Sequence, residues 1–198
     1  MMLWNERYAI KEYAYGKEPN DFLRRTADDI MPGDVLCLAE GEGRNAVYLA
    51  EQGFKVTAVD LSEVGLAKAN RLAQERGVNI ETIHADLADF PIEPESWNGV
   101  VSIFCHLPKA IRKPLHQRVV AGLKPGGTLI FEAYHPGQLE LDTGGPKDPD
   151  RLPDLDTLRA ELAGLNMQLM HDIHRPIQEG QFHNGEGHVV QILAFKPQ

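Results

Sequence analysis

The stretch "CLAEGEGRN" combines glycines that suit a nucleotide-binding turn with carboxylates that do not suit a phosphate. Gly41 and Gly43 allow the backbone to approach a ligand closely, and Glu40 and Glu42 alternate with them. Asp60 follows about 20 residues later, the spacing at which an acidic residue after a second strand accepts both hydroxyls of a ribose. The pattern predicts a site for a ribose-containing cofactor. The alternative is that the glycines only permit a tight turn in a domain that binds nothing there.

The two carboxylates decide which cofactor the turn favours. A dinucleotide places an anionic pyrophosphate against such a turn, and two like charges about 4 Å apart cost about 4 kcal/mol at an effective dielectric constant of about 20. S-adenosylmethionine has no phosphate; it brings a sulfonium, an ammonium and a carboxylate, so nearby acidic side chains are tolerated and one can favour the cation. The turn therefore favours S-adenosylmethionine over a nicotinamide or flavin dinucleotide. Only Glu40 needs to face the ligand, because Glu42 can point to solvent or pair with Arg44.

A sheet is expected to position these residues, because short apolar runs alternate along the chain with turn signals and helix-like stretches. This order is typical of a parallel α/β sheet, and the apolar run "NGVVSIFCHL" is typical of a central strand covered on both faces. Ser62 is suited to cap a long helix that we expect to end at Gly77. We expect strands at 33–39, 54–60, 79–86, 98–107 and 128–134, and helices at 43–53, 62–77 and 108–123.

The chain after the third helix contains the remaining turns and the predicted edge of the sheet. The "KPGG" at 124–127 predicts a turn, and the run at 135–153, rich in Gly, Pro and Asp, predicts a long surface loop. A helix at 154–164 precedes strands at 165–175 and 187–197. Because only a loop separates these two strands, we expect them to pair antiparallel at one edge.

The composition excludes several classes of protein. With 20 Lys and Arg against 29 Asp and Glu, the net charge is -9, so we expect no nucleic-acid partner, because phosphate contacts need clustered basic residues. The apolar runs are far shorter than the roughly 20 residues of a membrane span. The start of the chain carries charges where a signal peptide has its apolar core. Cys37 and Cys105 lie in strand-like stretches, which favours buried thiols. We expect a cytoplasmic protein of one domain, without membrane association.

The turn, Asp60, the "ADL" after the third strand, the "LKPGG" before the fifth and the terminal hairpin together resemble a class I S-adenosylmethionine-dependent methyltransferase. "IFCHLP" and "TGGP" are most similar to the bacterial branch of tellurite-resistance and thiopurine methyltransferases. The resemblance implies a Rossmann-like α/β fold, a three-layer sandwich around a seven-stranded, mostly parallel sheet of order 3-2-1-4-5-7-6 with strand 7 antiparallel. It divides the domain 1–198 into a lead-in or lid at 1–32, a cofactor-binding core at 33–134, a long loop at 135–153 and a C-terminal helix and β-hairpin at 154–198.

The resemblance also assigns cofactor contacts to residues that follow the predicted strands. They are Gly41, Gly43, Asn45 and Phe104 beside the methionine moiety, Asp60 at the ribose hydroxyls, Leu61 on one face of adenine, Asp86 at the adenine amino group and Leu87 as the backbone donor beside it.

Two positions depart from the family's pattern. The family has an acidic residue in strand one and a glycine before the variable position, and those places hold Cys37 and Ala39 here. We infer that Glu40 replaces the missing carboxylate, displaced along the turn. Removal of Glu40 is then expected to weaken cofactor binding by about tenfold or more.

Methyl transfer from a sulfonium is an in-line displacement, so the protein mainly aligns the acceptor and excludes water, and a general base is needed only if the acceptor must lose a proton. The ends of strands four and five place Cys105, His106, Tyr134 and His135 on the acceptor side. His106 is the candidate catalytic acid/base group, and a capping or supporting histidine is the alternative. We expect Cys105 to be a packing thiol and His135 to be solvated.

Aromatic residues gather in the lead-in at Trp4, Tyr8, Tyr13 and Tyr15. Either they cover the cofactor as part of a lid, with cation–π attraction to the sulfonium, or they pack the lead-in against the domain. Tyr15 is the expected cofactor contact because Gly16 places it in a turn.

A metal site is not expected among the histidines. His171 and His174 point to opposite faces of a predicted strand, and no cysteine lies near them.

We therefore expect S-adenosylmethionine-dependent methyl transfer to a small-molecule acceptor such as a thiol, a chalcogen oxyanion or a heterocycle. One alternative is an S-adenosylmethionine-binding regulatory protein without turnover. The other, disfavoured by the acidic turn and the terminal hairpin, is a nicotinamide-dependent reductase. The oligomeric state stays open.

Overall fold

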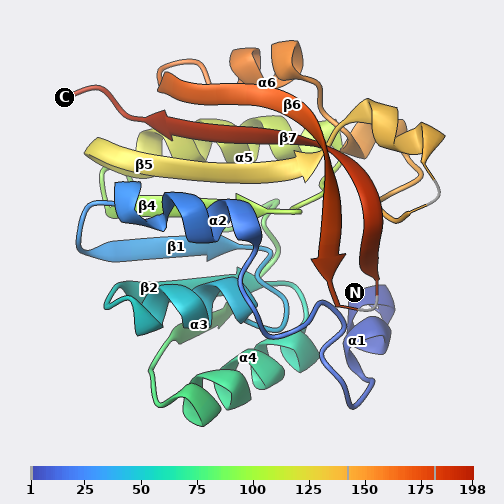
Figure 1. Ribbon diagram of the computed structural model, residues 1–198. Coiled ribbons are helices and arrows are strands. Elements are labelled where there is room, and N and C mark those ends of the chain that lie inside the picture. The colour runs from blue at the N-terminus through green and yellow to red at the C-terminus, as the bar shows by residue number, and fades with distance from the viewer. Residues whose placement is uncertain (1, 142, 181) are drawn as a thin grey trace.

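A seven-stranded sheet lies at the centre of the computed structural model, which describes residues 2–141, 143–180 and 182–198 (Figure 1). Its order is β3-β2-β1-β4-β5-β7-β6, and β7 runs antiparallel to both of its neighbours while the other pairs are parallel. The predicted topology is confirmed. The strands are β1 Asp34–Leu38, β2 Lys55–Asp60, β3 Glu81–His84, β4 Trp97–Ile103, β5 Leu123–Tyr134, β6 Asn166–Glu179 and β7 His183–Phe195.

Helices cover both faces of the sheet and form the outer two layers (Figure 1). One apolar cluster joins α5 and α6 to β1, β4, β5 and β7, and another joins α2 and α3 to the opposite face of the same strands. The helices are α1 Met2–Tyr8, α2 Asp21–Thr26, α3 Arg44–Glu51, α4 Glu63–Arg76, α5 Lys109–Gly122 and α6 Leu155–Glu161, with short 3-10 turns η1 Ala27–Asp29, η2 Pro136–Glu140 and η3 Pro149–Arg151.

The predicted limits of the long helix α4 are confirmed. The Ser62 hydroxyl accepts a hydrogen bond from the backbone N of Gly65 at 3.1 Å, which satisfies one donor of the first turn. Gly77 ends the helix with φ of 71°, a left-handed conformation that glycine adopts without steric cost.

The predicted turn at 124–127 is part of strand β5 instead. The pairing with β4 shifts register between Trp97↔Leu123 and Gly99↔Thr128, so the extra residues form an irregularity inside the strand. Backbone hydrogen bonds to Lys196 hold this segment, which is why it does not leave the sheet.

The terminal hairpin is longer than the sequence pattern predicts. β6 continues to Glu179 and β7 begins at His183, so both strands extend beyond the body of the sheet and bend towards α1 (Figure 1). Pro176 is tolerated within β6 because β6 is an edge strand that pairs only with β7. The extension brings the hairpin tip to the end of the sheet where the cofactor turn lies.

The loop predicted at 135–153 is not irregular throughout. It contains the turns η2 and η3, which the sequence pattern does not predict.

Across the described part of the chain, none of the helices has the length and apolar character needed to cross a bilayer.

Candidate functional site

The turn after β1 keeps Glu40 inside the protein, where its carboxyl group closes the N-terminus of α3. Glu40 is 9% exposed, and its Oε1 accepts hydrogen bonds from the backbone N of Asn45 at 2.9 Å and of Ala46 at 2.8 Å. A helix N-terminus leaves these N–H groups without an intrahelical partner, and in a dinucleotide site such groups bind phosphate. Burial raises the pKa of Glu40 to about 7, against the opposing effect of the two bonds and of Arg44. The protein's own carboxyl group therefore fills the phosphate position.

Glu42 neither points to solvent nor pairs with Arg44, so both predicted alternatives for this side chain are wrong. It is buried, its Oε1 lies 2.5 Å from Nζ of Lys68 in α4, and its Oε2 accepts a hydrogen bond from the backbone N of Ala14 at 2.7 Å. Lys68 also donates to three backbone carbonyls of the segment 8–12. Glu42 and Lys68 thus hold the lead-in against the domain.

Asp60, at the end of β2, lies beside the turn with its carboxylate oriented by backbone donors. It is 6% exposed; Oδ2 accepts from the backbone N of Gly41 at 2.8 Å and Oδ1 from that of Ser62 at 2.7 Å. Burial raises the pKa of Asp60, and these bonds oppose the rise. A carboxylate has about four acceptor positions, so both oxygens can accept a further hydroxyl.

Tyr8 of α1 packs over the same turn. A Cβ atom on Gly41 would lie 2.5 Å from the Tyr8 hydroxyl oxygen, so only glycine permits this approach. The Tyr8 side chain is buried, and burial together with the charge of Asp60 raises the pKa of its hydroxyl. The lead-in therefore covers the ribose side of the candidate site.

The residues assigned to adenine lie at the ends of β2 and β3. The backbone oxygen of Leu61 lies 3.0 Å from Nε2 of His84, and Leu87 is buried. Asp86 is exposed, and its Oδ1 accepts from the backbone N of Ala88 at 2.9 Å. The structure thus places these three residues just after the carboxyl ends of β2 and β3, at the same end of the sheet as Asp60.

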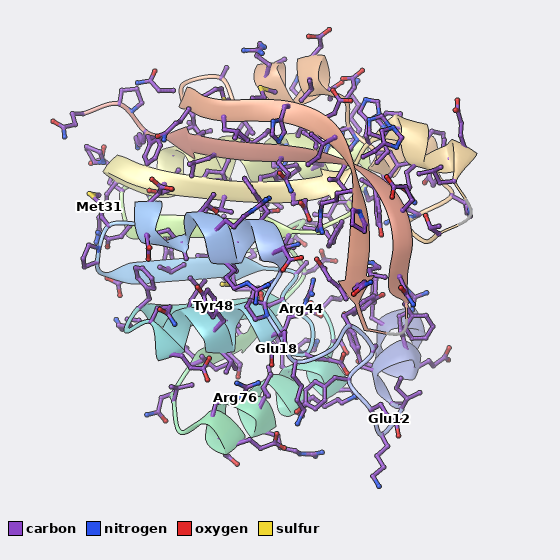
Figure 2. All side chains as sticks on the ribbon, viewed as in Figure 1. Glu12, Glu18, Met31, Arg44, Tyr48 and Arg76 are labelled. Carbon is purple, nitrogen blue, oxygen red and sulfur yellow. The ribbon has the colours of Figure 1, made fainter. Side chains whose placement is uncertain are left out.

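The start of α3 meets both the lead-in and the hairpin. Oδ1 of Asn45 accepts a hydrogen bond from the backbone N of Asn20 at 2.9 Å. Arg44, labelled in Figure 2, lies within 2.5 Å of Glu179 Oε2 through its Nη2 atom. Its Nη1 atom is buried and has no hydrogen-bond partner among the described residues. A buried guanidinium nitrogen without a partner is costly, and this atom is available to donate a hydrogen bond to an anionic partner.

An aromatic cluster follows at the ends of β4 and β5. Phe104 has a φ of 53°, an uncommon conformation that costs about 1–3 kcal/mol and is typical of functional sites. Its ring centroid lies 4.9 Å from that of Tyr134 and 4.6 Å from that of His183, and His183 lies 4.5 Å from Tyr15. Tyr15 also accepts a hydrogen bond from Arg7 Nη1 at 2.9 Å. The predicted contacts Phe104 and Tyr15 therefore meet through His183.

His106 lies against this cluster, but its ring is engaged by the backbone. Nε2 accepts a hydrogen bond from the backbone N of Tyr134 at 3.2 Å, and the two rings stack with centroids 5.4 Å apart. Burial, with smaller effects of His183 and Arg151, lowers the pKa of His106 to about 3. Because the hydrogen bond from Tyr134 occupies the lone pair of Nε2, the structure favours a supporting role for His106 over acid/base catalysis. The neighbouring Cys105 is buried as expected, and burial raises the pKa of its thiol to about 12.

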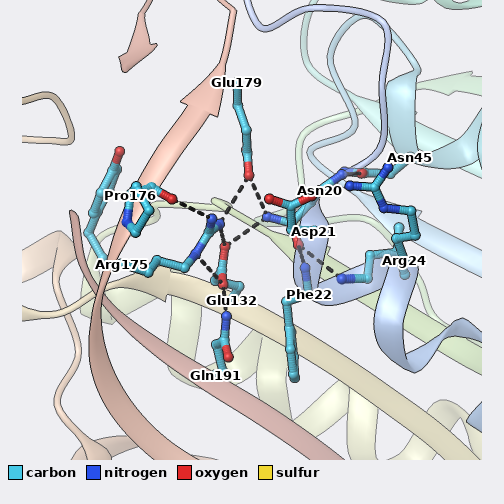
Figure 3. Close-up of polar contacts among 12 residues, drawn as sticks. Asn20, Asp21, Phe22, Arg24, Asn45, Glu132, Arg175, Pro176, Glu179 and Gln191 are labelled. Atoms are coloured by element: carbon cyan, nitrogen blue, oxygen red, sulfur yellow. Dashed lines mark hydrogen bonds and ion pairs between the residues drawn. The ribbon is translucent and has the colours of Figure 1, made fainter. Parts of the chain in front are cut away.

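A buried charge network joins the hairpin to β5 and to the lead-in (Figure 3). Glu132 is fully buried and pairs with Arg175, whose Nη2 lies 2.5 Å from Oε1 and whose Nε lies 3.2 Å from Oε2. Asn20 Nδ2 donates to Glu132 at 2.7 Å and to Glu179 at 2.9 Å, and Gln191 donates to Glu132. Although burial pushes the pKa of Glu179 upward, the guanidinium groups around it hold that pKa below its ordinary value.

His171, His174 and His188 lie on the hairpin, and His135 lies beside it at the start of η2. His171 and His174 are three residues apart on β6 and so face opposite ways. His135, Asp172 and His188 share one face and can each bring a potential ligand atom within 4.8 Å of the others. His188 Nε2 already lies 2.7 Å from Asp172 Oδ2, and His135 Nδ1 accepts from a backbone N at 3.0 Å, so internal hydrogen bonds hold this group. The absence of a metal stays a prediction.

Sequence reasoning missed three residues that the structure places in the site: Tyr8, Arg44 and His183. Tyr8 is one of five aromatic residues in the lead-in, and nothing in the sequence distinguishes it from the others. The sequence indicates Arg44 only as a partner of Glu42. His183 comes from the far end of the chain, and only the unexpected length of the hairpin carries it to the site.

Comparison with known proteins agrees with this geometry. Residues 35–127 match a family profile described as a methyltransferase domain. A 2-heptyl-1-hydroxyquinolin-4(1H)-one methyltransferase of Mycobacteroides abscessus is 26% identical over 68% of this chain and 60% of its own length. A probable S-adenosyl-L-methionine-dependent methyltransferase of Haemophilus influenzae, TehB, is 33% identical over 49% of this chain and 33% of its own length.

Solved structures show the same fold. A structure described as "Conversion of a Disulfide Bond into a Thioacetal Group during Echinomycin Biosynthesis" has a TM-score of 0.77 at 17% identity, covering 98% of this chain and 88% of that one. The structure of TehB from Haemophilus influenzae has a TM-score of 0.69 at 20% identity, covering 89% of this chain and 61% of that one. The chain spans about half the length of the curated relatives it matches.

Proposed function

We propose that this chain is a class I S-adenosylmethionine-dependent methyltransferase similar to TehB and that it transfers a methyl group to a small-molecule acceptor. The family uses S-adenosylmethionine as the methyl donor. When bound, this cofactor supplies an electrophilic methyl group attached to a sulfonium.

The observation that carries the proposal is the position of the Glu40 carboxyl group. Its two hydrogen bonds to the backbone N of Asn45 and Ala46 fill the N-terminus of α3, where a dinucleotide would place its pyrophosphate. The donors and acceptors around the turn suit S-adenosylmethionine instead. Asp60 can accept the ribose hydroxyls, and the unpartnered Nη1 of Arg44 can receive the methionine carboxylate.

The protein's part in the reaction is to orient the reactants and to exclude water. Under this proposal the backbone of Gly41 and Gly43 approaches the methionine moiety, Asn45 supports the turn from α3, and Tyr15 and Phe104 shield the reacting centre. On the adenosine side, Leu61, Asp86 and Leu87 contact the adenine.

His106 helps to form the wall of the acceptor side under this proposal. Its hydrogen bond from the Tyr134 backbone keeps its ring fixed against the end of β5.

The acceptor that we propose is a soft or small molecule: a thiol, a chalcogen oxyanion or a heterocycle. The relative from Mycobacteroides abscessus is named for a hydroxyquinolinone, which supports a heterocycle, and the aromatic cluster around Phe104 supports an apolar molecule. We further propose that residues 1–198 act as one domain in the cytoplasm, with 1–32 as a lid, and that no nucleic acid is bound, given the net charge of -9.

Two measurements test the proposal. Calorimetry with S-adenosylmethionine, S-adenosylhomocysteine and NADH is expected to show binding of the first two alone, and binding of NADH alone would support a reductase. A panel of thiols, tellurite, selenite and thiopurines is then expected to release S-adenosylhomocysteine with at least one acceptor. Tight cofactor binding without release from any acceptor would support the alternative, a regulatory protein without turnover.

A further inference from the structure

His183 lies at the start of β7, on the part of the hairpin that extends beyond the sheet, and it is enclosed by aromatic rings. Its ring centroid lies 4.5 Å from that of Tyr15, 4.6 Å from that of Phe104 and 5.6 Å from that of Tyr134. The side chain is 9% exposed. These three rings come from the lead-in and from the ends of β4 and β5, so His183 lies on the acceptor side of the site.

The Nδ1 atom of His183 has no hydrogen-bond partner among the described residues, although it is buried. A buried polar atom without a partner costs free energy and needs an explanation, of which an absent ligand is one. His106, in the same cluster, has its Nε2 engaged by the Tyr134 backbone at 3.2 Å. The two neighbouring histidines therefore differ, because one supports the wall and the other offers a free nitrogen.

We propose that Nδ1 of His183 accepts a hydrogen bond from the nucleophilic atom of the methyl acceptor, and that the acceptor is a flat apolar molecule bearing a thiol or hydroxyl group. This inference rests on the proposed function. The surrounding rings favour an apolar, flat body. In the tautomer that carries its proton on Nε2, the free Nδ1 is an acceptor and pairs with one polar group that carries a proton.

The proton then has a defined path. The lone pair of the acceptor's sulfur or oxygen forms the new bond to the methyl carbon, and the methyl–sulfonium bond breaks with its electrons remaining on sulfur. The acceptor's proton passes to Nδ1 of His183 and from there to water. The products are the methylated acceptor, S-adenosylhomocysteine and one proton.

The charges around His183 keep its lone pair available. Arg7 of α1, Arg44 of α3 and Arg175 of β6 all act on it, and Glu179 pairs with the last two. Burial first, and these guanidinium groups second, lower the pKa of His183 to about 3. The imidazole therefore stays neutral from about pH 5 to 8 and can accept a hydrogen bond throughout that range.

The hairpin tip is packed tightly enough to fix the position of His183. A Cβ atom on Gly180 would lie 2.5 Å from the backbone oxygen of Ala14, so the tip contacts the lead-in through backbone atoms. The lead-in that carries Tyr15 and the hairpin that carries His183 thus form one wall.

The test compares His183→Ala and His183→Gln with the control His171→Ala, with thiophenol as the acceptor at about pH 5, where its thiol carries the proton. His171 lies on the same hairpin, with its Nε2 3.2 Å from Gln191. We expect kcat/KM for thiophenol to fall about 100-fold in His183→Ala and about tenfold in His183→Gln, because a lost hydrogen bond to the reacting atom costs such factors. The control should stay within about twofold, and the Kd of S-adenosylmethionine should stay within about threefold in all variants.

A measurement without turnover completes the test. In protein labelled with ¹⁵N-histidine and saturated with S-adenosylhomocysteine, the His183 signals should report a neutral ring from pH 5 to 8 and Nδ1 should shift when thiophenol is added. A silent Nδ1 signal, or a His183→Ala variant within about threefold of wild-type kcat/KM, would overturn the inference alone. The binding of S-adenosylmethionine to wild-type protein is measured before any variant is tested. If the wild type does not bind it, the proposed function is overturned.

Discussion

The cofactor side and the acceptor side of the site are built in different ways. On the cofactor side, Glu40 and Asp60 lie within one continuous stretch of chain, residues 40–62, and backbone N–H donors of that stretch hold their carboxyl groups. On the acceptor side, the rings of Tyr15, Phe104, Tyr134 and His183 come from four segments that are distant in the sequence. The first side therefore depends on local backbone geometry, and the second depends on whatever holds the lead-in and hairpin in place.

The buried carboxyl groups on the cofactor side and on the acceptor side also differ in their partners. Glu40 and Asp60 accept hydrogen bonds from neutral backbone groups, whereas Glu132 and Glu179 pair with guanidinium groups from other elements. Mutations in the second group are expected to cost stability, and mutations in the first group to affect mainly cofactor binding.

The largest effect is expected from Arg175→Ala. Removal of this guanidinium leaves Glu132, which is fully buried, without its charged partner, and breaking such a pair costs about 3–5 kcal/mol of unfolding free energy. Urea denaturation at pH 7 measures the loss. Lys17→Ala is the control, because its pair with Glu75 is exposed and should contribute less than about 1 kcal/mol. Equal losses in the two variants would contradict the view that the network holds the acceptor side together.

A smaller loss, about 2–4 kcal/mol, is expected for Lys68→Met. Its Nζ pairs with Glu42 and donates to three carbonyls of the lead-in. A hydrogen bond to a charged group contributes a net of about 1.5–3 kcal/mol, and the bonds of one group are not additive. Limited proteolysis should cleave the segment 8–15 of the variant faster, while Arg71→Ala on the same helix should behave like wild type. Unchanged protection of this segment would show that the lead-in is held by its aromatic packing instead.

The same division explains what the sequence predicted. The alternation of strands and helices and the position of Asp60 followed from local sequence patterns. The strand order and the positions of Leu61, Asp86 and Leu87 were implied by the family resemblance, which rests on motifs of consecutive residues. The partners of Glu42 and the position of His183 did not, because they depend on contacts across many residues.

The hairpin shows most clearly why these long-range contacts could not be predicted from the sequence. Gly, Pro and polar residues at 176–186 predict a loop, yet the edge position of β6 tolerates Pro176 and the extended pairing carries His183 to Phe104. Periodicity alone could not reveal this pairing.

On the cofactor side, Asp60→Asn should weaken S-adenosylmethionine binding by about 10–100-fold, which corresponds to about 1.4–2.8 kcal/mol. The reason is that the buried carboxylate loses its charge and one of its acceptor oxygens towards the ribose hydroxyls. Asp86→Asn should cost about 3–10-fold, because Asp86 is exposed and water competes for its hydrogen bond. Calorimetry measures both constants, and a larger loss for Asp86→Asn would reverse the proposed order of contacts.

The smallest expected effect concerns Glu40 and is visible mainly as a pH dependence. Burial raises the pKa of Glu40 to about 7, above its ordinary value of 4.5. The folded protein therefore binds a proton at Glu40 that the unfolded chain has released, so this group's contribution to stability is full below pH 4.5, declines as the pH rises to about 7 and is lost above it. Glu40→Gln keeps an oxygen that accepts from the α3 backbone but cannot ionise.

We therefore expect the unfolding free energies of Glu40→Gln and wild type to agree near pH 4.5, and the variant to be more stable by about 1–2 kcal/mol at about pH 6, with a larger difference at pH 8. Glu40→Ala is the matched variant that removes the cap as well, and it should lose about 0.5–2 kcal/mol at acid pH. A constant difference between Glu40→Gln and wild type across pH 4.5 to 8 would contradict a buried, titrating carboxyl. If both variants bind S-adenosylmethionine about tenfold more weakly, the charge of Glu40 acts on the cofactor. If only Glu40→Ala does, Glu40 acts through the helix N-terminus that it closes.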